Sequence, residues 1–221
     1  MLLRYWQLMV ARILIMVVRR FTSFDVHGIE NLRNVQKPLI ITPNHKSMID
    51  SFLVGAAIIT KRPDLAPLYF MTKDRLFTYP FLNFFIWSLG AFRANKKKGL
   101  ERSLRTPHRL LRDGAAVFVF PEAHIVPDRT KLGQGRKGAA VLASATGVPL
   151  LPVSFFTSEH LTLGNFLIGK SRLVVRIGPS FWIGGINPRH LEEELEKATN
   201  TIMDEIADLY RQDEPQLKWR E

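Results

Sequence analysis

Hydrophobic and polar residues alternate along the chain in blocks that predict strands and helices in turn. Residues 37–44 and 114–121 are nearly continuous apolar runs, which is typical of strands buried on both faces of a sheet. The other predicted strands are residues 21–28, 66–72, 90–94, 148–156 and 172–178. The predicted helices are residues 47–60, 99–112, 138–146 and 191–209. This alternation predicts an α/β protein, with layered αβα architecture around a mostly parallel sheet.

Two polar residues follow directly on predicted strands. His45 lies just after the strand at 37–44, and Glu122 lies just after the strand at 114–121. Ligands of parallel α/β sheets bind beyond the carboxyl ends of the strands. We therefore expect both side chains at the ligand-binding edge of the sheet.

Residues 1–20 have the pattern of a helix that lies in a membrane interface. Arg4, Arg12 and Arg19 fall on one side of a helical wheel, and nearly all the other residues are apolar. Arg12 interrupts the apolar run, so the uncharged stretches are far shorter than the roughly 18 residues of a spanning helix. A core helix with an arginine stripe is the alternative. We predict an interfacial helix at 1–20 and one α/β domain at 21–221.

The net charge of the chain indicates which kinds of partner it binds. Its 31 Lys and Arg against 20 Asp and Glu give a net charge of +11. Residues 188–221 hold ten of the acids and five of the bases, so the preceding residues carry a net charge of +16. A body this basic predicts a phosphate-bearing partner: nucleic acid, lipid headgroups or an anionic substrate. Cysteine is absent, which excludes disulfides, thiolate metal sites and a cysteine nucleophile.

The stretch "PNHKSMIDSF" contains a candidate catalytic pair, His45 and Asp50. At about 100° per residue, a spacing of five would leave the two side chains roughly 140° apart on one helix. They can meet if His45 lies in the turn and Asp50 in the first helical turn. A carboxylate that orients a histidine is the arrangement of general-base catalysis. In the alternative, Ser47 and Asp50 form a capping box and Asp50 is purely structural.

Residues 76–92 carry no charge and are rich in aromatic side chains. Pro80 disfavours a spanning helix here. The run could pack in the core, or it could form an acyl-chain tunnel or a surface that dips into a membrane. We favour the acyl-chain tunnel or the membrane surface over the core. In that case Arg75, Arg93 and the lysines at 96–98 would contact anionic headgroups.

The stretch "GQGRKG" at 133–138 matches the dinucleotide fingerprint G-x-G-x-x-G. That fingerprint needs a turn directly after a strand, because the turn brings backbone amides to the pyrophosphate. Residues 122–132 separate it from the preceding predicted strand. Dinucleotide binding is therefore disfavoured.

Four blocks within residues 38–155 resemble, in order, the motifs of the glycerolipid acyltransferase family, which includes the lysophosphatidic acid acyltransferases. The first is Asn44-His45-x-x-x-x-Asp50, and the second is "KDRLFTYPFLNFFIWSLGAFRANK", beginning at Lys73 and containing Arg93. The third is "FPEAHI", with Pro121 and Glu122, and the fourth is "VPLLPV", with Pro149 and Pro152. Each block is moderately specific, and the occurrence of all four in the order of the family makes the resemblance specific.

The resemblance implies an O-acyltransferase reaction. His45 would remove a proton from the acceptor hydroxyl, and the oxygen would attack the thioester of acyl-coenzyme A or acyl carrier protein directly. Asp50 would orient His45, and Ser47 would only cap the helix. No acyl-enzyme, cofactor or metal is expected beyond the acyl donor as co-substrate.

The resemblance also implies a set of substrate-binding residues. The phosphate-binding groups of the family correspond to Lys73, Arg93 and Glu122, and Asn44 of the first block joins this set. Glu122 would hold a basic group or an acceptor hydroxyl. In the structural alternative, Lys73 and Arg93 are solvated surface charges and Glu122 is an ordinary strand-end residue. Pro121, Pro149 and Pro152 are the prolines of the motifs, and a structural role is implied for them.

The third block departs from the family pattern. The family has glycine after Pro-Glu and an arginine shortly afterwards, where this chain has Ala123, His124 and Ile125. The missing guanidinium removes a bidentate phosphate ligand. We include His124 in the predicted binding set. Replacement cations are available in the basic loop that follows, at Arg129, Arg136 and Lys137.

These observations together predict a peripheral or monotopic enzyme on the cytoplasmic face of the cell membrane that converts lysophosphatidic acid to phosphatidic acid. Another lysolipid or a glycolipid is the alternative acceptor. A non-catalytic basic module that binds membranes or nucleic acid is a further alternative. Nucleic-acid binding predicts aromatic residues interleaved with basic ones, whereas the aromatic residues here cluster in an uncharged run.

Overall fold

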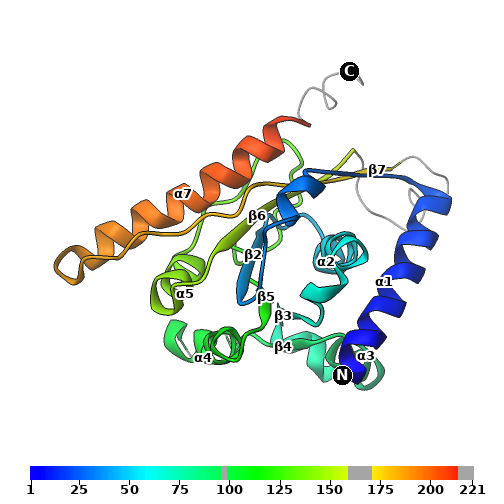
Figure 1. Cartoon of the computed structure of the whole chain (residues 1–221), viewed down its shortest axis with the longest axis horizontal. Coiled ribbons are helices and arrows are strands. Elements are labelled where there is room, and N and C mark those ends of the chain that lie inside the picture. The colour runs from blue at the N-terminus through cyan, green and yellow to red at the C-terminus, as the bar shows by residue number, and fades with distance from the viewer. Residues whose placement is uncertain (96–98, 159–170, 214–221) are drawn as a thin grey trace.

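A seven-stranded sheet forms the centre of the protein, seen in a computed structural model that describes residues 1–95, 99–158 and 171–213 (Figure 1). The strand order is β1-β7-β6-β2-β5-β3-β4, and only the β6–β7 pairing is antiparallel. The strands are β1 (Ser23–His27), β2 (Leu39–Pro43), β3 (Leu68–Thr72), β4 (Ala91–Arg93), β5 (Ala116–Phe118), β6 (Leu150–Thr157) and β7 (Arg172–Ile177). The predicted α/β class with a mostly parallel sheet is confirmed.

Helices cover both faces of this sheet (Figure 1). They are α1 (Leu2–Phe21), α2 (Asp50–Lys61), α3 (Pro80–Ser88), α4 (Leu100–Arg112), α5 (Gly138–Thr146) and α7 (Leu191–Arg211). Successive residues of a strand point to opposite faces, so β2 contributes to two cores. Leu39 and Ile41 pack in the core under α1 and α2, whereas Ile40 packs in the core under α4, α5 and α7.

The first helix is packed into the domain. Leu8, Ala11 and Val18 of α1 belong to the core that α2 shares with the sheet. The buried carboxamide of Gln7 accepts a hydrogen bond from the Leu68 N–H at 2.8 Å and donates to the carbonyls of Leu68 and Leu89. Among the described residues, no helix is long and apolar enough to cross a membrane. The predicted position of α1 in a membrane interface remains a prediction, and the opposite face of the helix is exposed.

The uncharged run predicted at 76–92 divides between core and surface. It contains α3, which was not predicted, with Pro80 at the first helical position, where its missing N–H leaves no bond unmade. Phe77 and Ile86 are buried, whereas Phe81 and Phe84 are 92% and 70% exposed. The run therefore supplies some core packing and a solvent-facing aromatic surface. The lysines at 96–98, predicted to flank that surface, lie outside the described residues.

Candidate active site

The candidate catalytic pair lies in the turn between β2 and α2. Nδ1 of His45 is 3.3 Å from Oδ2 of Asp50, and the side chains are 15% and 0% exposed. β2 ends at Pro43 and α2 begins at Asp50, so the histidine is in the turn and the aspartate in the first helical turn. The predicted meeting of the two side chains is confirmed, although a catalytic role stays a prediction.

The carboxylate of Asp50 also organises the turn itself. It accepts the backbone N–H groups of Lys46 and Ser47 at 2.5 and 2.7 Å and the Ser47 hydroxyl. The prediction that Ser47 caps the helix is wrong: α2 begins at Asp50 after Ile49, without a side-chain cap. The reason is that the hydroxyl of Ser47 is drawn to the Asp50 carboxylate. Asp50 is thus both a structural acceptor and a partner of His45.

Glu122 holds two loops together. Its buried carboxylate accepts the backbone N–H of His45 at 2.5 Å and that of Gly133 at 2.6 Å. The carbonyl of His45 accepts the N–H of Val126 at 2.8 Å. The imidazole stacks on the ring of Phe120, with centroids 4.1 Å apart. These contacts favour a positioning role for Glu122, and its predicted contact with substrate remains a prediction.

Lys46 is a buried residue that the sequence analysis did not single out. It is 5% exposed, and its Nζ donates to the carbonyls of Asp128 and Lys131 at 2.8 and 2.5 Å. The ammonium also lies 4.9 Å from the ring centroid of Tyr210. Burial lowers the pKa of Lys46 below its ordinary 10.5, while nearby carboxylates, Glu122 foremost, oppose the shift. Lys46 thus holds the loop after β5 in place. In the sequence, only its position next to His45 could have indicated this role.

Asn44 joins the first motif block to β6, the strand that continues from the fourth block. Its buried carboxamide donates to the carbonyl of Phe155 at 3.0 Å and accepts the N–H of the same residue at 2.6 Å. Pro152 of the fourth block faces Thr42 across the parallel β2–β6 pair. The Pro149 carbonyl accepts the N–H of Ile40 at 3.0 Å. Asn44 therefore positions the strand end, and a direct contact with substrate stays a prediction.

Lys73 and Arg93 lie at the carboxyl ends of β3 and β4, and both side chains are exposed. The sheet order places β2, β5, β3 and β4 consecutively and parallel, so their carboxyl ends share one edge with His45. The guanidinium of Arg93 lies 5.1 Å from the ring centroid of Phe77. The two cations are thus placed on the predicted edge, and phosphate binding remains a prediction.

The third-block loop contains the candidate replacements for the missing arginine. Lys137 pairs with Glu192 of α7 at 2.5 Å, and the Arg129 guanidinium donates to the Ser158 carbonyl. The Arg136 N–H binds the carbonyl of the buried Pro121 at 2.8 Å, while its side chain is exposed.

His124 is exposed, and Ala123 before it has a left-handed backbone with φ of 57°. A left-handed residue after Pro-Glu explains why the third-block pattern has glycine at that position.

Of the three candidate replacement cations, Arg129 and Lys137 are bound to other residues. Arg136 is the one whose side chain has no partner among the described residues.

A cavity of about 560 Å³ lies away from this edge, lined by residues of β1, β7 and α7. It contains none of the predicted site residues. β1 and β7 run opposite to the five other strands, so their carboxyl ends lie at the opposite edge of the sheet. The motif residues, and not this cavity, mark the candidate active site.

Comparison with known proteins gives consistent results. The family model for acyltransferases matches residues 23–156. A 1-acyl-sn-glycerol-3-phosphate acyltransferase of Pseudomonas aeruginosa is 25% identical over 84% of this chain and 70% of the relative. The Bacillus subtilis protein of the same name is 23% identical over 83% of this chain and 86% of the relative. The crystal structure of the 1-acyl-sn-glycerophosphate acyltransferase from Thermotoga maritima is similar with a TM-score of 0.61 and 25% identity, over 88% of this chain and 79% of that chain.

A mostly parallel sheet with a histidine and an aspartate in contact at the carboxyl ends of its strands defines an α/β protein with a polar site where such sheets bind ligands. The family match over residues 23–156 makes this specific, and the chain belongs to the acyltransferase family. The predicted family and the predicted class of enzyme are confirmed.

Proposed function

We propose that this protein transfers a fatty acyl group from an acyl thioester to the free hydroxyl of 1-acyl-glycerol-3-phosphate, which gives phosphatidic acid. The observation that carries the proposal is the contact between His45 and the buried Asp50 at the carboxyl edge of the sheet. The names of the relatives from Pseudomonas aeruginosa and Bacillus subtilis support this acceptor. Acyl-coenzyme A and acyl carrier protein are both suitable donors.

In this proposal His45 is the general base. With the proton of the neutral ring on Nδ1 and directed to Asp50, Nε2 has a free lone pair for the acceptor hydroxyl. The hydroxyl oxygen attacks the thioester carbonyl as Nε2 takes its proton. When the carbon–sulfur bond breaks, the imidazolium returns the proton to the leaving thiolate. Asp50 stabilises the imidazolium in between, and neither a covalent acyl-enzyme nor a cofactor is needed.

Lys73 and Arg93 are proposed to hold the glycerol phosphate. Both project from strand ends on the same edge as His45, and both are exposed to an incoming ligand. Charge-assisted hydrogen bonds to phosphate are roughly twice as strong as neutral ones. The two cations would therefore select an acceptor with a phosphate and orient its free hydroxyl towards Nε2.

The third-block loop supports a second candidate acceptor, another lysolipid or a glycolipid. The arginine of the family pattern is missing, and Lys137 and Arg129 are already bound to Glu192 and Ser158. Of the three candidate replacements, Arg136 then remains for a phosphate. An acceptor without a phosphomonoester would need fewer cations at this edge.

The test combines acyl transfer with substitution of the proposed base. Purified protein is incubated with labelled acyl-coenzyme A or acyl carrier protein and a panel of lysolipids, and products are identified by mass. We expect phosphatidic acid, and we expect His45→Ala to lower turnover by about 10²–10⁴-fold or more. His27→Ala is the matched control, because His27 is exposed at the end of β1 on the opposite edge. Acyl transfer by His45→Ala at the wild-type rate would exclude the proposed mechanism.

A further inference from the structure

The solvent face of α4 carries a row of four arginines: Arg102, Arg105, Arg109 and Arg112. The spacing of three, four and three residues places them on one side of the helix, and all four are exposed. The other side of α4 is buried at Leu104, Pro107 and Leu111. None of the four forms an ion pair within the described part of the chain. Like charges at this spacing repel each other, so binding of an external anion would stabilise the row.

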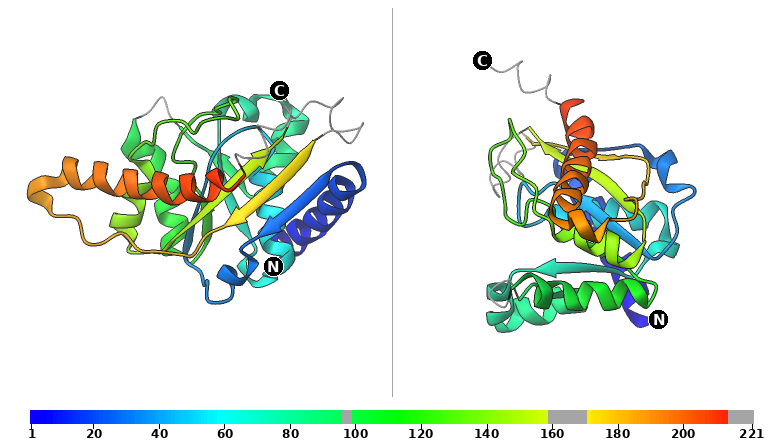
Figure 2. Two further views of the ribbon diagram at one scale, coloured as in Figure 1. Left: turned by 90° about the horizontal axis from the view of Figure 1, so that it is seen from above. Right: turned by 90° about the vertical axis from the view of Figure 1, so that its left-hand side faces the viewer.

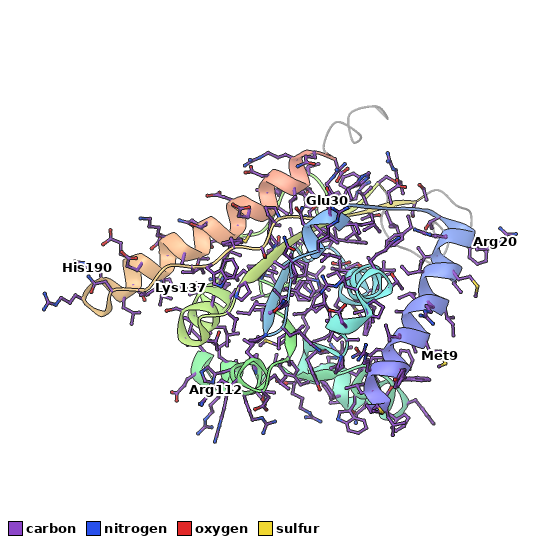
Figure 3. All side chains as sticks on the ribbon, viewed as in Figure 1. Met9, Arg20, Glu30, Arg112, Lys137 and His190 are labelled. Atoms are coloured by element: carbon purple, nitrogen blue, oxygen red, sulfur yellow. The ribbon has the colours of Figure 1, made fainter. Side chains whose placement is uncertain are left out.

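An aromatic surface lies on the same side of the molecule. Phe81, Phe84 and Trp87 of α3 are 92%, 70% and 64% exposed. Helices α3 and α4 both form the lower edge of the molecule in Figure 1 and in the right-hand view of Figure 2. Figure 3 places Arg112 at this lower edge. Exposed aromatic rings and a row of cations on the same side of a molecule are the combination that membrane surfaces attract.

The aromatic surface continues onto the start of α1. The indole of Trp6 donates to the Ser88 hydroxyl at the end of α3, at 3.1 Å. Leu2 and Tyr5, close by in the sequence, are 89% and 61% exposed. The apolar surface thus extends beyond one short helix. Apolar side chains as exposed as these are a poor match for an acidic soluble protein, but they fit the acyl region below lipid headgroups.

We propose that the arginine row of α4 is a docking surface for anionic lipid headgroups, with the aromatic residues of α3 inserted into the same bilayer. The proposal rests on the proposed function, because a lipid acceptor must be taken from a membrane. α3 follows the carboxyl end of β3 and α4 follows that of β4, so a bilayer docked there would lie beside Lys73 and Arg93. The acceptor could then reach the catalytic edge without crossing water.

The test is binding of the full chain to vesicles with and without the row. The probe is phosphatidylcholine with about 30% phosphatidylglycerol, against phosphatidylcholine alone, measured by flotation. The test variant changes all four arginines of the row to glutamine. A basic residue near an anionic surface contributes about fivefold in affinity, so we expect a loss of about several hundredfold for four. Binding of the wild type should also fall as salt is raised.

Two matched variants separate charge from folding and from net charge. Changing the four arginines to lysine keeps the charge and should leave vesicle binding within about threefold of the wild type. A second control removes four exposed cations elsewhere and should bind as the wild type does. Its substitutions are Arg33→Gln, Arg189→Gln, Lys197→Gln and Arg211→Gln. Thermal unfolding verifies that each variant is folded.

One outcome would overturn the proposal: a glutamine variant that floats with anionic vesicles as the wild type does. If that variant also lost turnover selectively with acyl carrier protein, the row would be assigned to an acidic protein instead. Transfer to a short-chain soluble lysophosphatidic acid, measured without vesicles, tests the proposed function separately. At saturating acceptor the turnover number should be the same in the wild type and the glutamine variant, because long-range charge then no longer limits capture. Absence of this activity from the wild type would refute the proposed function without affecting the flotation result.

Discussion

At the residue scale, His45 is held at its backbone and at its side chain. Its N–H is held by Glu122, its carbonyl by Val126, its Nδ1 by Asp50, and its ring by Phe120. These four partners lie on two segments of chain, residues 120–126 and the start of α2, and among the described residues they leave one ring nitrogen free. Such support is what a general base requires, since a misplacement of about 1 Å can cost about 10²-fold in rate.

Replacing Asp50 by asparagine tests its role beside that histidine. Asparagine keeps one acceptor oxygen for the N–H groups of Lys46 and Ser47 but cannot stabilise an imidazolium. We expect turnover to fall about 10²–10⁴-fold while the thermal midpoint changes by only a few degrees. Steady-state kinetics and calorimetry measure the two effects. Near-normal turnover would mean that Asp50 is only the structural acceptor of the turn.

Replacing Arg93 by alanine tests phosphate recognition. A charge-assisted contact contributes about 1.5–3 kcal/mol, so the Michaelis constant for lysophosphatidic acid should rise about ten- to a hundredfold. The constant for a neutral monoacylglycerol should hardly change. Arg33→Ala, which removes an exposed arginine after η1 (Ile29–Leu32), is the control. Equal losses for charged and neutral acceptors, with the wild type preferring the neutral one, would favour the alternative acceptor.

Ala123→Gly tests the departure in the third block. A left-handed conformation with a Cβ costs roughly 1–2 kcal/mol, and glycine avoids this cost but loses more backbone freedom on folding. We expect the free energy of unfolding to rise by about 0.5–1 kcal/mol in denaturant titrations. Ala143→Gly, in the middle of α5, should instead lower it by about 1 kcal/mol. Destabilisation by both changes would contradict the left-handed backbone at Ala123.

At the element scale, α1 is fixed to the sheet by polar as well as apolar contacts. The Gln7 carboxamide makes three hydrogen bonds with backbone groups of Leu68 and Leu89. We expect Gln7→Leu to lower the free energy of unfolding by about 2–4 kcal/mol, because it leaves buried backbone groups unpaired. Gln36→Leu, at an exposed position, should change it by less than about 0.5 kcal/mol. Equal stability of the two variants would mean that α1 is not fixed in this way.

At the scale of the whole molecule, charge is distributed unevenly. Glu192, Glu193 and Glu194 begin α7, which lies away from the arginine row of α4 (Figure 1). The chain before residue 188 carries the net positive charge of +16. An anionic substrate should therefore be attracted from a distance to the basic part of the protein.

This attraction predicts a salt dependence. For a soluble short-chain lysophosphatidic acid, kcat/KM should fall as added salt shortens the screening length from about 30 Å to about 8 Å. The same measurement with a neutral short-chain monoacylglycerol is the control and should be nearly flat. A flat response for both acceptors would show that long-range attraction does not contribute to substrate capture.

The sequence by itself determined the family and most of the elements, although it did not reveal α3. The continuous apolar runs gave the strands β2 and β5 because a strand buried on both faces has no polar side, and the α/β class followed from their alternation with helices. The four motif blocks identified the acyltransferase family and named His45 and Asp50. These are local properties, set by periodicity and by residue types at short spacing.

Only the tertiary structure decided which side chains meet across the chain. Asn44 binds Phe155, Glu122 binds the N–H groups of His45 and Gly133, and Lys46 joins the loop after β5. The strand order, with β7 antiparallel at β6, is likewise absent from the local pattern. Hydrophobic periodicity indicates which face of an element is buried, but not which other element that face packs against. Buried donors and acceptors must be hydrogen-bonded. Which groups far apart in sequence become partners is therefore decided only when the chain folds and buries them together.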